Sequence, residues 1–354
     1  MDHVSSPPHL QKMSDTFKFA NPLVFNLKPL VLYVVSTQRN PYEDGMKRPT
    51  RNIWLDTFFA RKTTQKVQDQ DLSGKTIVFT GGSDGMGRVA IERLASMGAD
   101  VHLVARNPEK SAKVLSELEA KGYPGALSSI LCDLSSLDDV RRAALEILQT
   151  CGKIDFLINC AGGNISERRV SAEGYELNFV VNYLSSFLLI ELLLERVKST
   201  PGARIVNLTS ATQKYGHLDF RDLHRERKWS VFSTYAQAKL CMIMHAEDVA
   251  ERLRGYDAVI NCLNPGYIQS NLGHELQGVE RLFTVLFGRL AAPTWVGGER
   301  IVAVALDAAY AGVSGKFIYE DAFMDPNPET RDKAKARKLL ELSFEMTGIS
   351  RATK

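Results

Sequence analysis

The stretch Thr80-Gly81-Gly82-Ser83-Asp84-Gly85-Met86-Gly87 decides how this chain is interpreted. It follows the apolar run 76–79 and opens a helical pattern. A strand, a glycine-rich turn and a helix in this order aim backbone N–H groups and a helix N-terminus at a phosphate. The glycine spacing, G-x-x-x-G-x-G, differs from G-x-G-x-x-G, and no Lys-Ser or Lys-Thr pair follows, as a P-loop would require. The loop alone therefore does not identify a nucleotide-binding fold, and further motifs elsewhere in the chain are required.

Apolar segments alternate with helical patterns after this loop. The expected strands are 101–105, 127–132, 154–158, 203–208 and 257–263, and helices are expected at 109–121 and up to about residue 150. Such alternation indicates βαβ units and a parallel sheet. The strands are almost continuously apolar, which is typical of a sheet covered on both faces. The predicted fold class is α/β, a Rossmann-type, doubly wound and mainly parallel sheet of about seven strands flanked by helices.

Further motifs follow the loop in a fixed order at strand and helix ends. Together with residues 80–87 they resemble the short-chain dehydrogenase/reductase family, and the matching residues are Asp133, Leu134, Asn159, Ala161, Gly162, Asn182, Ser210, Tyr235, Lys239, Pro265 and Gly266. The resemblance covers residues 72–350, which we expect to form a single catalytic domain. Segments 217–223 and 339–348 are similar to the retinol-dehydrogenase-like branch of the family.

Tyr235 and Lys239 are four residues apart on a predicted helix, so their side chains share a face. A tyrosine has a pKa near 10, and a nearby ammonium favours the phenolate. The resemblance implies that Tyr235 is the general acid/base, that Lys239 lowers its pKa and binds the nicotinamide ribose, and that Ser210 positions the substrate oxygen. Asn182 resembles the residue that completes a proton relay. Taken one by one, these are ordinary core, cap and surface residues; their joint occurrence favours catalysis.

Arg106 ends the second expected strand, where enzymes that use NAD place an acidic residue. A guanidinium fits a 2′-phosphate, so Arg106 favours NADP(H) over NAD(H), and a solvated arginine is the alternative. Asp84 adds an unfavourable negative charge nearby. The resemblance implies that Asp133 and Leu134 lie at the adenine, although Asp133 also fits a helix N-cap.

The resemblance implies further cofactor contacts in three segments of the chain. The first is the opening loop, through Thr80, Gly81, Ser83, Asp84, Gly85, Met86 and Gly87. The second is Asn159, Ala161 and Gly162, where Cys160 replaces the family's common second asparagine. The third is Pro265, Gly266, Ile268 and Ser270, where Ser270 takes the place of a threonine and keeps its hydroxyl. Neither replacement predicts an inactive protein.

Residues 267–294 occupy the region that, in the family, forms a lid and shapes the substrate pocket. Here it carries an apolar set consisting of Leu276, Leu282, Phe283, Leu286 and Phe287. As a pocket wall, this set favours a hydrophobic alcohol or carbonyl substrate such as a retinoid, a steroid or a lipid aldehyde. The alternative is that these side chains pack in the core or at a dimer interface.

The composition narrows the class of protein. The net charge of +3 over 354 residues is too small to indicate nucleic-acid binding. The five cysteines are scattered without metal-like spacing, so no metal site is expected, and buried free thiols in a reducing compartment are the plain interpretation. The length is sufficient for one large α/β core.

Residues 1–71 form an extension outside the resemblance, partly disordered or helical. The apolar run 22–36 is too short and too interrupted for a membrane span, and no signal-peptide pattern precedes it. The apolar residues of segment 53–59 fit an amphipathic helix at a membrane, or a helix packed on the catalytic domain or on a second subunit. We favour packing, because a stripe of aromatic residues is usually part of a core. We expect a cytoplasmic protein that is not secreted, with peripheral membrane contact as the alternative.

The leading hypothesis is an NADP(H)-dependent oxidoreductase that interconverts a hydrophobic alcohol and its aldehyde or ketone. One alternative is reduction of a conjugated C=C bond with the same tyrosine as proton donor. A second is a cofactor-binding scaffold or sensor without catalysis, against which the complete set of catalytic residues argues. The resemblance implies a homodimer or a tetramer, and the N-terminal extension is long enough to cover or replace the interface between subunits.

Overall fold

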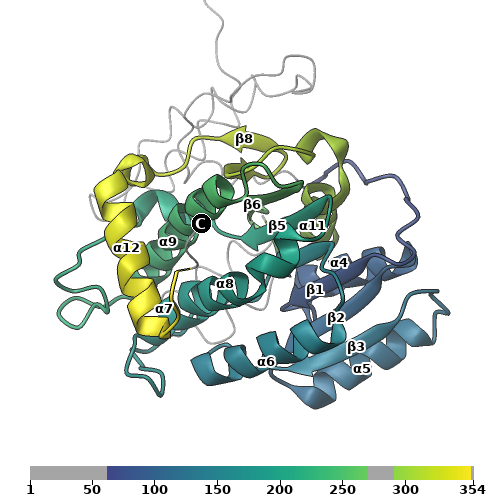
Figure 1. Ribbon diagram of the computed structural model, residues 1–354, viewed down its shortest axis with the longest axis horizontal. Coiled ribbons are helices and arrows are strands. Elements are labelled where there is room, and N and C mark those ends of the chain that lie inside the picture. Colours follow the sequence, from purple (N-terminus) through teal and green to yellow (C-terminus); the bar gives the residue numbers. More distant parts are fainter. Residues whose placement is uncertain (1–61, 270–290, 352–354) are drawn as a thin grey trace, which may run out of the picture. The chain divides into compact units, whose positions relative to one another are not determined.

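The computed structural model describes residues 62–269 and 291–351. All described residues belong to one compact unit. This unit is built around one eight-stranded sheet with strand order β3-β2-β1-β4-β5-β6-β7-β8 (Figure 1). The strands are β1 (Thr76–Thr80), β2 (Asp100–Ala105), β3 (Leu127–Leu131), β4 (Phe156–Asn159), β5 (Ala203–Leu208), β6 (Ala258–Asn264), β7 (Lys316–Tyr319) and β8 (Ala322–Met324).

All neighbouring strands from β3 to β7 are parallel, and β8 alone runs antiparallel, paired with β7. The order reverses between β1 and β4, which is the point where doubly wound sheets bind their ligands at the carboxyl ends of the strands. The predicted parallel α/β sheet is therefore confirmed. The six expected strands occur within two residues of their predicted ends, and β7 and β8 were not individually predicted.

Helices cover both faces of the sheet. One face carries α4 (Gly85–Ser96), α5 (Pro108–Glu119) and α11 (Thr294–Leu306). The other carries α6 (Leu137–Thr150), α8 (Ser185–Lys198) and α9 (Val231–Arg252), with α12 (Lys333–Thr347) packed outside α8 and α9. Short elements join them: α7 (Leu177–Phe179), a π-helical turn η1 (Val180–Leu184), and the 3₁₀ turns η2 (Ala211–Tyr215), η5 (Ala308–Tyr310) and η6 (Pro328–Arg331).

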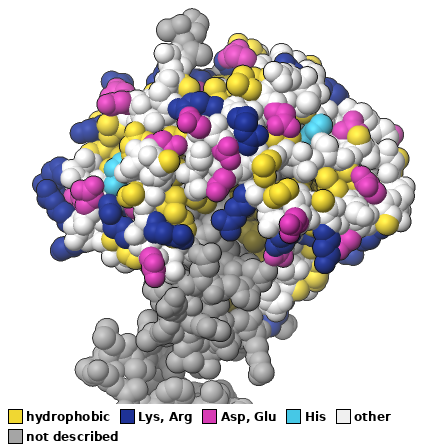
Figure 2. All heavy atoms as spheres, turned by 90° about the horizontal axis from the view of Figure 1, so that it is seen from below, with side chains coloured by type: hydrophobic (Ala, Val, Ile, Leu, Met, Phe, Trp, Pro, Cys, Tyr) yellow, Lys and Arg dark blue, Asp and Glu magenta, His cyan; other side chains and the backbone are white. Residues whose placement is uncertain are grey.

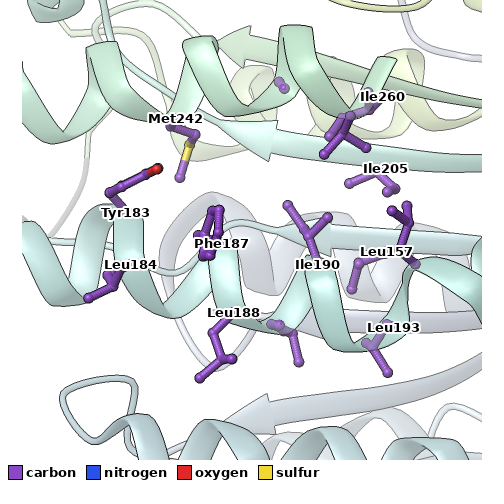
Figure 3. Close-up of a cluster of buried hydrophobic side chains, with 14 of the residues drawn as sticks. Leu157, Tyr183, Leu184, Phe187, Leu188, Ile190, Leu193, Ile205, Met242 and Ile260 are labelled. Atoms are coloured by element: carbon purple, nitrogen blue, oxygen red, sulfur yellow. The ribbon is translucent and has the colours of Figure 1, made fainter. Parts of the chain in front are cut away.

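The strand pattern divides the hydrophobic core into one cluster per face. Ile77 and Phe79 of β1 pack into the cluster beneath α4 and α11, whereas Val78 packs into the one beneath α8 and α9. This alternation is the period of two that a strand imposes on its side chains. Figure 3 shows how Phe187 and Ile190 of α8 lie against strand residues and Met242 of α9.

Helix α8 is apolar on nearly all sides because it is enclosed. An 18-residue window of the stretch Leu177–Lys198 has a mean hydropathy of 1.8, enough by length and composition for a membrane span, yet 78% of that window is buried inside the protein. Tyr183 and Phe187 contact α12, since Tyr183 is hydrogen-bonded to Ser343 (2.8 Å) and the Phe187 ring meets that of Phe344. Core packing therefore accounts for its hydrophobicity.

The distribution of charged side chains on the surface is consistent with the net charge of +3. Figure 2 shows Lys and Arg side chains interspersed with Asp and Glu over one face. All five cysteines are free; four are buried and Cys160 is half-buried. The extension up to residue 61 and most of the expected lid, including its apolar set and Ser270, lie outside the described residues, and the boundary at 71/72 stays a prediction.

Candidate active site

The glycine-rich loop leaves β1 and enters α4 in a conformation that needs its glycines. Gly81 has a φ of +76°, and a Cβ there would lie 2.6 Å from the backbone of Ala161. A Cβ on Gly87 would collide with the Gly81 carbonyl. The loop is therefore folded tightly on itself and on the chain after β4, with its backbone close to the N-terminus of α4.

Asp84 is the N-cap of α4, because its carboxylate accepts a hydrogen bond from the Gly85 N–H (2.7 Å). The same carboxylate forms an ion pair with Lys110 in the first turn of α5 (2.6 Å). The negative charge that the sequence places in the glycine-rich loop is thus offset by a lysine that sequence reasoning did not single out. Lys110 lies four residues after Arg106, and this spacing is the sequence signal from which its place near Asp84 could have been inferred.

Arg106 is exposed immediately after β2, and no carboxylate in the described part of the chain pairs with it. Asp133 follows β3 and accepts a hydrogen bond from the Ser135 N–H (2.9 Å) in a local turn. The helix that follows is capped by Ser136, so Asp133 is not the N-cap. Both residues therefore lie at strand ends on the carboxyl edge of the sheet.

The segment after β4 is held by buried amides. Asn159 donates a hydrogen bond to Asn207 on β5 (2.9 Å), and the Ala161 N–H donates to the Thr80 hydroxyl (3.2 Å). Asn182, fully buried in the π-helical turn, accepts from the Gly163 N–H (3.0 Å) and donates to the Gly163 carbonyl (2.8 Å). Its amide is therefore engaged in holding this segment; π-helical turns are frequent at functional sites.

Tyr235, Ser210 and Lys239 lie together beside this segment. Lys239 is buried, donates to the Leu208 carbonyl (2.9 Å), and has its ammonium 5.4 Å from the centre of the Tyr235 ring. A Cβ on Gly162 would lie 3.4 Å from that ammonium and 2.8 Å from the Asn182 side chain. The structure thus brings the four expected catalytic residues to the same edge of the sheet.

Burial dominates the electrostatics of this group. It raises the pKa of Tyr235 to about 12, although a hydrogen bond with Ser210 acts to lower it. It lowers the pKa of the Lys239 ammonium to about 8. Burial therefore sets the direction of the tyrosine pKa in the protein without cofactor, and the expected effect of Lys239 on that pKa stays a prediction.

The chain after β6 makes the third side of the site. Ile268 forms a single bridge with Ala292, where the Gln269 N–H donates to the Ala292 carbonyl (2.8 Å). Ile268 is buried and packs in one small cluster with Met86 of the glycine-rich loop and Val296 of α11. Residues 265–269 are therefore attached to both the loop and α11.

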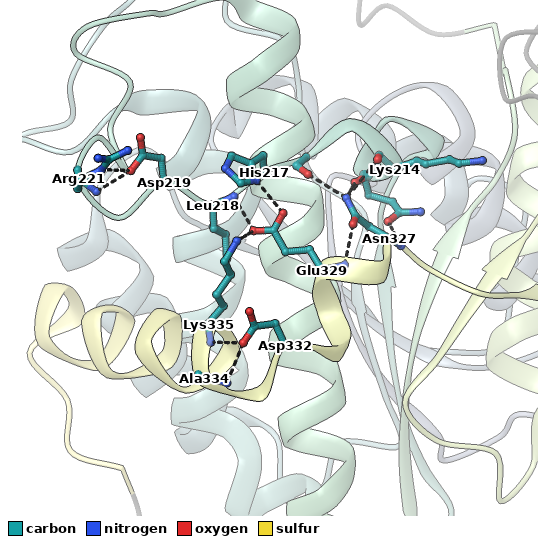
Figure 4. Close-up of polar contacts among 12 residues, drawn as sticks. Lys214, His217, Leu218, Asp219, Arg221, Asn327, Glu329, Asp332, Ala334 and Lys335 are labelled. Carbon is teal, nitrogen blue, oxygen red and sulfur yellow. Dashed lines mark hydrogen bonds and ion pairs between the residues drawn. The ribbon is translucent and has the colours of Figure 1, made fainter.

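Polar contacts anchor the turn that follows Ser210 to the C-terminal segment (Figure 4). Asn327 donates to the carbonyls of Gln213 (3.0 Å) and Gly216 (2.8 Å). Glu329 accepts from the Leu218 N–H (3.1 Å) and from Lys335 (2.6 Å). The segment 217–223, singled out in the sequence, is thus clamped by the chain that leads into α12.

The glycines of this site and the first turn of α4 leave room and hydrogen-bond donors suited to a dinucleotide. At Gly81, Gly87 and Gly162 any side chain would collide with its surroundings, whereas nothing lies within 4 Å of a Cβ placed on Gly85. Ser83, Gly85 and Met86 remain accessible beside the first turn of α4. Such a turn offers unpaired N–H groups and a positive dipole end to a pyrophosphate.

Comparison with known proteins identifies the family. The family model described as short chain dehydrogenase matches residues 75–280, more than half of the 354-residue chain. The chain belongs to the short-chain dehydrogenase/reductase family. This short-chain dehydrogenase is 30% identical to human "Retinol dehydrogenase 13" over 284 residues, covering 78% of this chain and 86% of the relative. It is 31% identical to mouse "Retinol dehydrogenase 14", covering 78% and 87%.

Solved structures support the fold of this short-chain dehydrogenase. A putative uncharacterized protein from Mycobacterium Paratuberculosis superimposes with a TM-score of 0.63 at 23% identity, over 82% of this chain and all of that one. L-Sorbose reductase from Gluconobacter frateurii, solved with NADPH and L-sorbose, gives 0.57 at 19% identity, over 73% and 98%. The protein is therefore a short-chain dehydrogenase/reductase enzyme of the retinol-dehydrogenase-like kind.

Proposed function

We propose that this enzyme uses NADP(H) to interconvert a hydrophobic alcohol and its aldehyde or ketone. The observation that supports this most directly is the convergence of Tyr235, Ser210 and Lys239 beside the segment after β4. The relatives named as retinol dehydrogenases favour a retinoid-like substrate, and the NADPH in a structural neighbour agrees with the proposed cofactor.

Each part of the site has a proposed role toward the cofactor. The 80–87 loop and the N-terminus of α4 would hold the pyrophosphate, and Asp133 with Leu134 would lie at the adenine. Lys239 would bind the ribose hydroxyls. The segments at 159–162 and 265–268 would flank the nicotinamide, with Ser270 beyond the described residues. When bound, the cofactor supplies or accepts the hydride.

The protein's own contribution to carbonyl reduction is control of one proton. Ser210 donates a hydrogen bond to the carbonyl oxygen, and Tyr235 delivers its phenolic proton to that oxygen as the hydride arrives. A pKa of about 12 keeps Tyr235 protonated at neutral pH, as a proton donor must be. Lys239 stabilises the phenolate that forms, and Asn182 holds the segment against which the lysine lies.

Arg106 supports NADP(H) over NAD(H). It is exposed at the end of β2, where a 2′-phosphate would lie, and Lys110 offsets the charge of Asp84 nearby. The Arg106→Asp variant should lose affinity for NADPH much more than for NADH. Equal losses for the two cofactors would remove Arg106 as the selecting residue. We also propose that the enzyme is cytoplasmic and forms a homodimer.

The reaction is tested by following NADPH absorbance with retinaldehyde, other hydrophobic aldehydes and conjugated enones. Tyr235→Phe should abolish turnover and leave NADPH binding, measured by fluorescence, close to that of the wild type. Full activity in that variant would overturn the mechanism. Reduction confined to the C=C bond of the enones would replace the carbonyl reaction by the alternative one.

A further inference from the structure

Arg300 is among the largest fully buried side chains in the described part of the protein, although it lies on a mostly apolar helix, α11, beside the buried Glu299. Its side chain has 0% exposure. A buried guanidinium is costly unless its donors are satisfied, and apolar residues of similar size often stabilise a protein equally well. The presence of an arginine here therefore calls for a role that a leucine or methionine side chain would not fill.

Two acidic residues hold this guanidinium. Asp321 accepts from Nε (3.3 Å) and Nη2 (3.4 Å), and Glu320 lies 3.8 Å from Nη2. Both belong to the two-residue turn between β7 and β8, the hairpin that sequence reasoning did not anticipate. Glu320 has a φ of +55°, a strained conformation for a residue with a side chain, and it is buried. The hairpin thus presents both carboxylates to α11.

The remaining end of the guanidinium reaches the candidate cofactor site. Nη1 of Arg300 donates to the Pro265 carbonyl, and the distance of 2.6 Å is that of a short, charge-assisted hydrogen bond. Gly266, with a φ of +84°, lies so close that a Cβ would be 3.0 Å from Nη1 and 2.8 Å from the Glu320 carboxylate. The 265–266 turn therefore rests directly on the Arg300–Glu320–Asp321 cluster.

The same cluster contacts the segment that precedes the catalytic domain. The Thr64 hydroxyl donates to Asp321 (2.8 Å), and the Val67 N–H donates to Glu299, the neighbour of Arg300 on α11 (3.2 Å). Arg93 of α4 also donates to Glu299 (3.1 Å) and to the Val67 carbonyl (2.7 Å). Residues 64–67 are thus connected through one carboxylate to the arginine that binds the 265–266 turn.

We propose that Arg300 is a positioning residue that fixes the 265–266 turn for cofactor binding, and that Asp321 couples this turn to Thr64. The part that concerns the cofactor rests on the proposed NADP(H) function. The part that concerns the turn itself applies to the protein without cofactor. Without Arg300, the Pro265 carbonyl loses its buried hydrogen-bond donor, and Gly266 loses the guanidinium against which it packs.

The test compares Arg300→Met and Arg300→Lys with the wild type, all as full chains. Arg252→Met is the matched control, because Arg252 is a mostly buried arginine that pairs with Glu191 (2.6 Å) at the far end of α9. Hydrogen–deuterium exchange of residues 266–269 is measured without cofactor, NADPH affinity by fluorescence, and kcat and KM by absorbance. Thermal unfolding reports stability in each variant.

Arg300→Met should speed exchange at residues 266–269 and raise the Kd and KM for NADPH roughly tenfold or more, the usual effect of losing a charged hydrogen bond. Arg300→Lys should recover part of the affinity, since an ammonium also donates to a carbonyl. Arg252→Met should lower the melting temperature while leaving exchange at 266–269 and NADPH affinity unchanged. Wild-type exchange and affinity in Arg300→Met would overturn the proposal.

Two milder variants keep the proposal falsifiable if Arg300→Met does not fold. Thr64→Val removes one hydroxyl from Asp321, and Asp321→Asn removes its charge; both should speed exchange at 266–269, and wild-type exchange in both would refute the coupling. A wild-type protein that binds neither NADPH nor NADH would defeat the proposed function, whereas the exchange measurements would still decide the role of Arg300.

Discussion

Replacing Lys239 by methionine should stabilise the protein while destroying its activity. Lys239 is buried, and burial lowers its pKa from the ordinary value of 10.5 to about 8. At neutral pH the folded protein therefore holds an ammonium whose charge is disfavoured. The difference between the two pKa values corresponds to ~3 kcal/mol of destabilisation below pH 8.

The variant also loses a favourable contact. The Lys239 ammonium donates to the Leu208 carbonyl (2.9 Å), and loss of that hydrogen bond costs about 1 kcal/mol. The net expectation for Lys239→Met is a gain of ~2 kcal/mol in the free energy of unfolding at pH 7, since methionine fills a similar volume without a charge. Turnover should fall by roughly 100-fold or more, because proton transfer loses the group that stabilises the phenolate.

The sign of the pH dependence gives an independent check. Between pH 8 and 10.5 the unfolded lysine binds a proton that the folded one has released, so the contribution of Lys239 to stability rises with pH in this window. Lys239→Met should remove that rise. Lys113→Met, at an exposed lysine on α5, should change neither the stability nor its pH dependence.

Guanidinium unfolding followed by circular dichroism at pH 7, 8.5 and 10 measures all three proteins. If Lys239→Met were less stable than the wild type at pH 7, the reasoning from its buried charge would be refuted. Retained turnover in the same variant would refute its proposed catalytic role separately, so the two outcomes do not obscure each other.

Three further perturbations have defined outcomes. Gly87→Ala should abolish NADPH binding in a fluorescence titration, because the new Cβ collides with the Gly81 carbonyl, whereas Gly152→Ala, with open space around it, should bind normally. Asn327→Ala should reduce kcat more than it raises the KM for NADPH, because three carbonyls after Ser210 lose their donor; an unchanged kcat would contradict the clamp. Although burial opposes it, His245 and Arg252 lower the pKa of Glu191 to about 2, so acid titration should remove ~3 kcal/mol of stability between pH 4.5 and 2, and Glu191→Gln should lack that loss.

The parallel sheet was predictable because each buried strand is an apolar run that ends in a small or polar residue. The 203–208 strand was predicted with the bounds that β5 has in the structure. β7 and β8 were not individually predicted, since strands of four and three residues carry too little periodicity to be distinguished from a loop. The position of α12 against α8 depends on contacts between residues far apart in the chain, and no local pattern specifies them.

The candidate site was predictable where it consists of ordered motifs, such as the loop at 80–87 and the pair formed by Tyr235 and Lys239. Its electrostatics were not, because a pKa depends on burial as well as on charged neighbours, and burial raises that of Tyr235. Arg300 was missed for a related reason. The pair Glu299 and Arg300 was visible in the helical pattern, but the partners of Arg300 lie about 20 residues later, on a hairpin that was not predicted. The partner of Glu299, Arg93, lies 206 residues earlier in the chain.

The packing of α12 has a consequence for how the protein is made. Leu339, Leu340 and Phe344 complete the hydrophobic cluster on the outer side of α8, and they come about 150 residues after Phe187 in the sequence. During synthesis a chain folds from its N-terminal side as residues emerge. The faces of Phe187 and Tyr183 that α12 covers therefore stay exposed until residues 339–344 have been made. If translation stops shortly before residue 339, the product contains every candidate catalytic residue, but the outer side of α8 is uncovered. We expect chaperones to bind this truncated protein.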